Sequence, residues 1–253
     1  MIRLLAFSLI FLITSSCTQT NVSTKVLFVT TNVSQMNGEP NGTYLIELAV
    51  PFNLFVKNKI DIEIVSPKGG EIPIYHNGDT SSVVQAVVDS ALFKAKTKNS
   101  LSPEEVRATE YSAVVIPGGY GQFWDTHKNT DLLEIIADVH EQGGVIGTIG
   151  HGTATLINVK LKSGDYLFKD KTLTSFPSWN EKNVMKQSNF GDLLPYDMEV
   201  ELRKRGADLK VYDHEAKTNY EVVDAKNKLV TASFAGSGEF LAEEIIKLIN
   251  SPN

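Results

Sequence analysis

Two glycine-rich segments, one of them with a histidine, offer backbone N–H groups that can bind an anion. Ile149-Gly150-His151-Gly152 and Pro117-Gly118-Gly119-Tyr120-Gly121 each follow a short apolar run typical of a buried strand. A strand that turns directly into a helix directs the first N–H groups of that helix into a cleft, where they can hold a carbonyl oxygen or a carboxylate. The pattern predicts a small carbonyl or carboxylate ligand bound by Gly118, Gly119, Tyr120, Gly150 and Gly152.

Glu47 and Trp124 extend this group of candidates. Glu47 lies in a helical pattern after the first strand, and its apolar neighbours Ile46 and Leu48 favour a pocket position, where a carboxyl group can act as an acid or a base. Trp124, close behind the Gly118-Gly119 pair, is expected in the pocket wall. Plainer alternatives remain, namely an exposed Glu47 and a histidine that only binds a backbone carbonyl.

Alternating strand and helix patterns determine where these residues meet. Apolar or alternating runs predict strands at residues 26–30, 60–65, 113–116, 145–149, 171–174, 209–212 and 229–233. Helical spacing predicts helices at residues 44–56, 82–94, 131–142, 197–205 and 239–249, with a short helix from the glycine turn to residue 157. This alternation favours an α/β fold with a mostly parallel central sheet, covered on both faces. Ligands bind at the carboxyl ends of the strands in such sheets, where both glycine-rich segments lie.

The ordered set of motifs resembles the ThiJ/PfpI superfamily, also called DJ-1/PfpI. The resemblance rests on Glu47, on the Pro-Gly-Gly-Tyr-Gly segment with Trp124-Asp125, on the turn at His151, and on residues 234–239. Further segments are most similar to the branch of heat-shock chaperones and glutathione-independent glyoxalases: NVKL at 158–161, LTSF at 173–176, LPYDMEVEL at 194–202 and LVTAS at 229–233. The resemblance implies one class I glutamine amidotransferase-like domain over residues 25–250, with a flavodoxin-like three-layer α/β/α sandwich, and a homodimer.

The resemblance also implies which residues form the site. The glutamate of the first helix corresponds to Glu47, the histidine of the turn to His151, and the acid that orients this histidine to Glu181, for which a plain surface position is the alternative. In that branch a cysteine thiolate adds to the aldehyde of a 2-oxoaldehyde, and a 2-hydroxy acid such as D-lactate results. Gly150 stands at the cysteine position, and glycine offers no nucleophile. Tyr120 stands where the branch commonly carries histidine.

Two hypotheses follow from the missing cysteine. One is a protein that keeps the pocket but has lost the thiol-dependent reaction, and that binds a small ligand or acts as a chaperone-like module. The alternative is a glyoxalase III-type enzyme (a D-lactate dehydratase) that acts through Glu47 and His151 with water. Neither needs a cofactor, and the 5 histidines are too scattered to suggest a metal site.

The N-terminal sequence predicts that the protein is exported from the cytoplasm. An apolar run at residues 4–13 is too short to span a bilayer and is typical of a signal peptide. Ser15 and Ser16 precede Cys17 as in a lipobox, which predicts a signal peptide over residues 1–17 and lipidation of Cys17. Residues 18–24 are then expected to form a tether. The protein would lie in the cell envelope, anchored to a membrane and facing the periplasm or the exterior. A secreted protein with an incidental Cys17 and a cytoplasmic protein are the alternatives.

Composition excludes other classes of protein. The chain has 253 residues, 42% of them hydrophobic, 18 glycines, 9 prolines and a single cysteine, which fits neither a collagen nor a disulfide scaffold. A net charge of −6 gives no basic field for a phosphate backbone, so no nucleic acid partner is expected.

Overall fold

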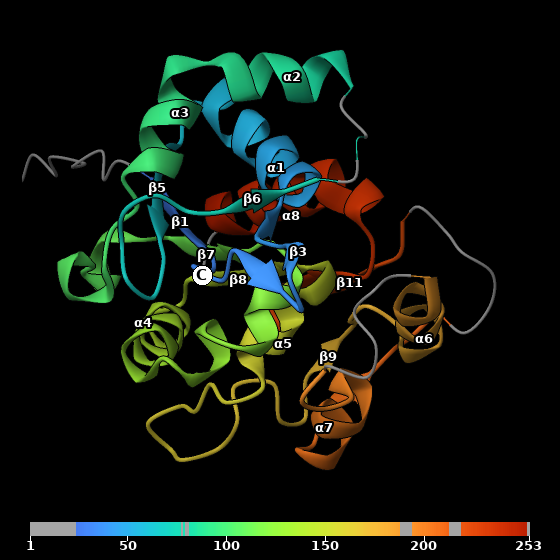
Figure 1. The fold of residues 1–253 in the computed structure, drawn as a ribbon. Coiled ribbons are helices and arrows are strands. Elements are labelled where there is room, and N and C mark those ends of the chain that lie inside the picture. The colour runs from blue at the N-terminus through green and yellow to red at the C-terminus, as the bar shows by residue number, and fades with distance from the viewer. Residues whose placement is uncertain (1–23, 77, 79–80, 188–193, 213–218, 252–253) are drawn as a thin grey trace, which may run out of the picture.

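A six-stranded sheet forms the centre of the molecule (Figure 1). The computed structural model describes residues 24–76, 78, 81–187, 194–212 and 219–251. In sheet order the strands are β11 (Glu221–Asp224), β12 (Leu229–Ala232), β8 (Val145–Ile149), β7 (Ala113–Ile116), β1 (Lys25–Val29) and β5 (Asp61–Val65). All neighbouring pairs are parallel except β11 with β12.

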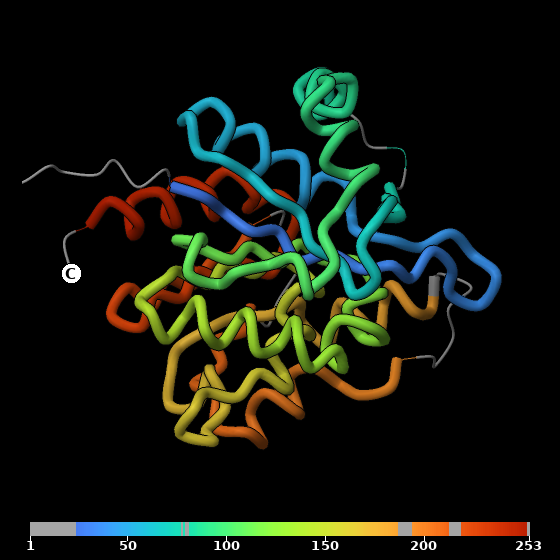
Figure 2. The backbone as a smooth tube through the Cα atoms, turned by 90° about the vertical axis from the view of Figure 1, so that its left-hand side faces the viewer, coloured from blue at the N-terminus to red at the C-terminus, as the bar shows by residue number. Residues whose placement is uncertain are grey.

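The central strands are apolar along their whole length because both faces of the sheet are covered. Every residue of β7, β8 and β12 is buried. Helices α1 (Leu45–Lys57), α2 (Ser82–Asp89), α3 (Ala91–Lys98) and α8 (Gly238–Asn250) pack on one face, and α4 (Thr130–Glu141), α5 (Thr153–Leu156) and α7 (Met198–Lys204) pack on the other. Figures 1 and 2 show these three layers. The expected α/β/α sandwich with a mostly parallel sheet is confirmed.

Shorter elements complete the described structure. Three two-stranded sheets pair β2 (Gln35–Met36) with β3 (Glu39–Pro40), β4 (Thr43–Tyr44) with β6 (Ile74–Tyr75), and β9 (Thr172–Leu173) with β10 (Asp208–Leu209). Helix α6 (Ser178–Gln187) lies beside α7. Turns of 3₁₀ helix occur at Pro103–Glu105, Ala108–Glu110, Tyr120–Phe123, Thr126–Lys128, Gly150–Gly152, Ala225–Asn227 and Ala235–Ser237.

The prediction of one helix over residues 82–94 is wrong. Ser90 separates α2 from α3: it has extended backbone, and its hydroxyl accepts a hydrogen bond from the Phe93 N–H. Ser90 Oγ also donates to the Val87 carbonyl, 2.7 Å away, at the end of α2. One serine thus satisfies backbone groups of two helix ends, and this explains why an apolar pattern with helical spacing is interrupted there.

The N-terminal prediction concerns residues outside the described structure. Residues 1–23 include the predicted signal peptide and Cys17, and they lie outside it. Of the helices in the described part, none is long and apolar enough to cross a membrane.

Candidate functional site

Glu47 enters the site from the first turn of α1. The Tyr44 N–H, directly before this helix, donates to the Gly118 carbonyl at 2.9 Å and ties the start of α1 to the loop after β7. The Gly118 N–H in turn donates to Glu47 Oε2 at 2.7 Å. Glu47 is only 6% exposed, so the structure places its carboxyl group inside the protein rather than on the helix surface.

Gly150 lies where β8 ends, and the Glu47 carboxyl group fills the space beside it. The φ of Gly150 is +56°, a left-handed conformation that glycine adopts without steric penalty. A Cβ atom built on Gly150 would lie 2.4 Å from Glu47 Oε1 and 2.8 Å from Oε2. The position that the family resemblance assigns to a cysteine therefore has no room for a side chain while Glu47 keeps this conformation.

His151 and Glu181 form an ion pair across 30 residues of sequence. His151 Nε2 lies 2.6 Å from Glu181 Oε2, and the side chains are 11% and 13% exposed. The Tyr120 hydroxyl donates to the other oxygen of Glu181, Oε1, at 2.9 Å. Both carboxylate oxygens are thus occupied, and Glu181 is held against the imidazole ring rather than lying free on the surface.

Aromatic rings enclose the imidazole of His151. The rings of Tyr120, Phe176 and Phe123 lie with their centroids 4.4, 4.6 and 5.6 Å from that of His151. Burial alone would lower the pKa of His151, but the charge of Glu181, its hydrogen bond and the charge of Glu47 together raise that pKa above its ordinary value. The Glu181 carboxylate therefore favours the imidazolium form of the ring.

Burial has the opposite consequence for Glu47. Desolvation raises its pKa from 4.5 to about 7, although the positive charge of His151 and the hydrogen bond from the Gly118 N–H both favour the ionised form. A carboxyl group with a pKa near neutrality can both accept and donate a proton under physiological conditions. The site therefore combines a proton-exchanging carboxyl group with a histidine whose protonated form is favoured.

The glycines of the two loops allow close backbone contact. A Cβ on Gly119 would lie 2.0 Å from the Gly42 carbonyl oxygen, and a Cβ on Gly152 would lie 1.9 Å from the Ile116 carbonyl oxygen. The Gly118 N–H, predicted to hold a ligand, is engaged by Glu47 here. A ligand role for Gly118 stays a prediction, and it requires the Glu47 carboxyl group to move.

Hydroxyl groups near the turn are engaged with one another. Thr148 Oγ1 lies 2.7 Å from Thr153 Oγ1, and Thr155 Oγ1 donates to Gln122 Oε1 at 2.8 Å. All three threonines are fully buried, and none of them occupies the turn itself. They support the backbone around the site and offer no free replacement for a thiol.

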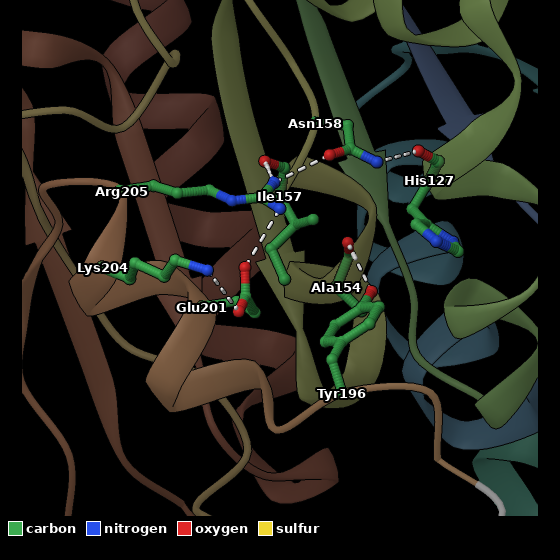
Figure 3. Close-up of polar contacts among 8 residues, drawn as sticks. All are labelled: His127, Ala154, Ile157, Asn158, Tyr196, Glu201, Lys204 and Arg205. Atoms are coloured by element: carbon green, nitrogen blue, oxygen red, sulfur yellow. Dashed lines mark hydrogen bonds and ion pairs between the residues drawn. The ribbon is translucent and has the colours of Figure 1, made fainter.

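Trp124, the remaining candidate residue, and a network of hydrogen bonds from Arg205 lie around α5, directly after the turn. Trp124 packs partly buried against the core beside Phe123, so one ring separates it from His151. On the other side, Arg205 of the α7 end donates to the Ile157 carbonyl and to Asn158 Oδ1, and Asn158 Nδ2 donates to the His127 carbonyl (Figure 3). Sequence patterns gave no indication of this network.

The described part of the chain contains no metal-binding cluster. Within residues 24–251, apart from the gaps, no three histidine, cysteine, aspartate or glutamate side chains gather closely enough to hold a metal ion. The site is thus built from two carboxyl groups, an imidazole and a phenol.

Replacing Glu181 with glutamine should lower the pKa of His151. The variant removes the carboxylate that favours the imidazolium and leaves the burial that disfavours it. Titration of the His151 ring by NMR will measure the change. Tyr120→Phe is the matched control, because it removes only a hydrogen bond to Glu181 and keeps the charge. An unchanged His151 pKa in Glu181→Gln would contradict the ion pair.

Glu47 should make the protein less stable as the pH rises. Between pH 4.5 and about 7 the folded protein retains a proton that the unfolded chain has lost, so the free energy of unfolding should fall by about 3 kcal/mol over this range. Glu47→Gln should remove this part of the pH dependence. Urea denaturation at several pH values will measure it, with the exposed Glu104→Gln as a control. Parallel pH profiles for wild type and Glu47→Gln would count against a raised Glu47 pKa.

Comparison with known families, sequences and structures identifies relatives of this chain. The sequence profile of the DJ-1/PfpI family matches residues 39–248. Glyoxalase 3 of Candida albicans is 26% identical over 181 residues, which cover 65% of this chain and 76% of that protein. The glutathione-independent glyoxalase HSP31 of Saccharomyces cerevisiae is 27% identical over 171 residues, covering 62% and 70%. The crystal structure of Rapid Encystment Protein 24 KDa from Francisella tularensis has a TM-score of 0.80 and 32% identity, covering 90% of this chain and all of that one.

Proposed function

We propose a function for this chain on the basis that it belongs to the DJ-1/PfpI family. In this proposal it binds a small carbonyl or carboxylate compound at the turn after β8 and forms no covalent adduct with it. Its relatives include a protein named glyoxalase 3 and one named as a glutathione-independent glyoxalase. In this proposal the chain retains a related site whose thiol-dependent reaction has been lost.

One observation carries the proposal: residue 150, at the turn after β8, has no nucleophilic side chain. The Glu47 carboxyl group occupies the space of a residue-150 side chain, and the single cysteine of the chain, Cys17, lies outside the described residues. Covalent capture of an aldehyde requires a nucleophilic side chain. Binding requires only complementary charge and hydrogen bonds, which Glu47 and His151 supply.

The electrostatics favour an oxygen-rich ligand. In its protonated form, which Glu181 favours, His151 attracts a carboxylate or a polarised carbonyl oxygen. Glu47 in its protonated form can donate a hydrogen bond to the same group. If the Glu47 carboxyl group turns toward a ligand, the Gly118 N–H becomes available as a further donor.

A second candidate function is a thiol-independent conversion of 2-oxoaldehydes. It is supported by the names of the relatives and by the near-neutral pKa of Glu47. Water would add to the aldehyde carbon, and transfer of hydrogen from that carbon to the neighbouring carbonyl carbon would give the 2-hydroxy acid. The balance is one 2-oxoaldehyde and one water for one 2-hydroxy acid, with Glu47 exchanging the protons.

Methylglyoxal separates the two candidates. Purified protein should bind pyruvate, an unreactive carboxylate of similar size, in calorimetry and form no D-lactate from methylglyoxal above the level of Glu47→Gln. D-lactate formation well above that of Glu47→Gln would contradict the non-covalent binding function and support the enzyme. Absence of both binding and turnover would contradict both candidates.

The N-terminus supports a separate proposal, attachment to a membrane through lipidated Cys17. A diacylglyceryl group together with an N-acyl chain anchors a protein firmly, whereas one chain binds only marginally. Cys17→Ser should therefore move most of the protein from the membrane fraction to the soluble fraction, or leave it unprocessed, as judged by fractionation and mass spectrometry. Wild-type protein found free and without lipid would contradict the anchor.

A further inference from the structure

A pocket of about 510 Å³ opens on the outer side of the His151–Glu181 pair. Helix α6 forms one wall, and the segment that leads into α7 forms the other. Its lining is mainly apolar, with Phe123, Phe176, Met185, Leu194, Tyr196 and Met198. A pocket of this volume with apolar walls and a few polar groups has the usual properties of a site for a small molecule.

The pocket is next to the turn after β8 but distinct from it. Phe123 and Phe176 contact the imidazole of His151 and also line the pocket. Glu181 lines the pocket as well, whereas Glu47 and Gly150 are not among the lining residues. The aromatic rings around His151 thus divide the region into an inner site at Glu47 and this outer pocket.

The acidic groups of the outer pocket are already engaged with donors. Glu181 accepts from the Tyr120 hydroxyl and pairs with His151. Asp197 Oδ1 accepts from the Ser178 hydroxyl at 2.7 Å and from the Val200 N–H at 3.2 Å, at the start of α7. These contacts hold the Glu181 carboxylate against His151 and the Asp197 carboxylate at the start of α7.

The basic groups are not engaged in this way. Lys182 and Lys186 lie one turn apart on α6, and both are exposed and line the pocket. Across the described residues, no carboxylate forms an ion pair with either ammonium group. The pocket therefore combines an aromatic interior with two lysine ammonium groups at its edge that form no ion pair among the described residues.

The wall opposite α6 is attached to the core of the site. The Tyr196 hydroxyl donates to the Ala154 carbonyl of α5 at 3.4 Å (Figure 3), and its ring packs 5.1 Å from that of Phe123. Arg205 fastens the other end of α7 to the end of α5. Tyr196 before α7 and Arg205 after it thus restrict the movement of this wall before any ligand binds, which lowers the entropic cost of binding.

We propose that this outer pocket binds an aromatic carboxylate, with its ring among Phe123, Phe176 and Tyr196 and its carboxylate on Lys182 and Lys186. Aromatic rings prefer tilted and edge-to-face neighbours, which these side chains supply, and Met185 adds a polarisable contact. The proposal is independent of ligand binding at Glu47, because it uses different residues.

Cinnamate and its neutral isostere cinnamamide provide the test, by calorimetry on the full protein. Cinnamate should bind at least about tenfold more tightly than cinnamamide. Lys182→Gln/Lys186→Gln should remove this preference and keep the weaker affinity for the amide, whereas the matched control Lys57→Gln/Lys68→Gln, which removes two exposed charges elsewhere, should retain it. Met185→Trp should abolish binding of both compounds by filling the pocket.

Three results would overturn the proposal. Equal affinity for cinnamate and cinnamamide would exclude recognition of the carboxylate by the lysines. Full binding to Met185→Trp, with thermal denaturation showing that the variant is folded, would place the ligand elsewhere. Loss of cinnamate binding in Glu47→Gln together with full binding to Met185→Trp would place it at the inner site, an outcome that would support the proposed function while contradicting the outer pocket.

Discussion

Gly150→Cys should convert the protein into a far more active consumer of 2-oxoaldehydes, raising methylglyoxal turnover by about 100-fold or more. The new thiol would lie at the start of a helical turn, beside His151, whose pKa is raised. Both features favour the thiolate, which is the nucleophilic form of cysteine. Glu47, with a pKa of about 7, would be next to the adduct and able to exchange its protons.

The same substitution should lower the free energy of unfolding by about 2 kcal/mol. A non-glycine residue at φ of +56° is strained, and the new Cβ must displace the Glu47 carboxyl group from its hydrogen bond with the Gly118 N–H. Both effects can be measured on one preparation, by D-lactate formation and by urea denaturation.

Gly150→Ala is the matched control for Gly150→Cys. It carries the same Cβ without the thiol, so it should lose a similar amount of stability and gain no activity. Gly150→Cys/Glu47→Gln should lose most of the gained turnover. A folded Gly150→Cys protein with a reactive thiol and unchanged turnover would show that the remaining groups are not arranged for the reaction.

Gly152→Ala should have the largest effect on stability, a loss of about 3 kcal/mol or more. Its φ of −55° is allowed for any residue, so the effect arises from space alone. The new methyl group would lie 1.9 Å from the Ile116 carbonyl oxygen and 2.8 Å from the carbonyl carbon. These are backbone atoms at the end of β7, so the contact can be relieved only by moving a central strand or the turn.

Gly238→Ala provides the comparison for Gly152→Ala. Gly238 also has helical backbone, with a φ of −60°, but its new methyl group would lie 3.2–3.3 Å from side-chain atoms of Val50 and Pro51, which can shift slightly. Its free energy of unfolding should stay within about 1 kcal/mol of wild type. Equal stability of Gly152→Ala and Gly238→Ala in urea denaturation would contradict the close contact at Gly152.

The sheet could be predicted because its central strands are buried on both faces. Residues 113–116 and 145–149 are uninterrupted apolar runs, and the structure places strands over the same residues. Elements without such a signal escaped prediction, α6 and β11 among them. Helix α6 is mostly polar, and β11 is an edge strand of partly buried residues that runs antiparallel to its neighbour. The pattern also extended one helix over Ser90, since a serine inside a helical pattern does not reveal the tertiary contacts that make it a cap.

The part of the site that lies at the carboxyl ends of the strands could be predicted from the sequence. Parallel pairing of β7 with β8 brings the Gly118 loop and the Gly150 turn together, as expected for neighbouring strands. Glu181 was named only through the family resemblance, because nothing in a polar helix indicates which face meets His151. The enclosure of His151 by Phe123 and Phe176 had no sequence signal beyond their apolar character. Which carboxyl group is desolvated depends on packing, so the raised pKa of Glu47 could be inferred only from the structure.

Glu47 and Gly150 share one volume, and substitutions at the two positions should therefore be strongly non-additive. A carboxyl group from α1 fills the place where a side chain of residue 150 would begin. Shortening residue 47 opens that place, and enlarging residue 150 then fills it again, so a double-mutant cycle should show a favourable coupling energy between them. The effect of a substitution at either position should therefore depend on which residue stands at the other.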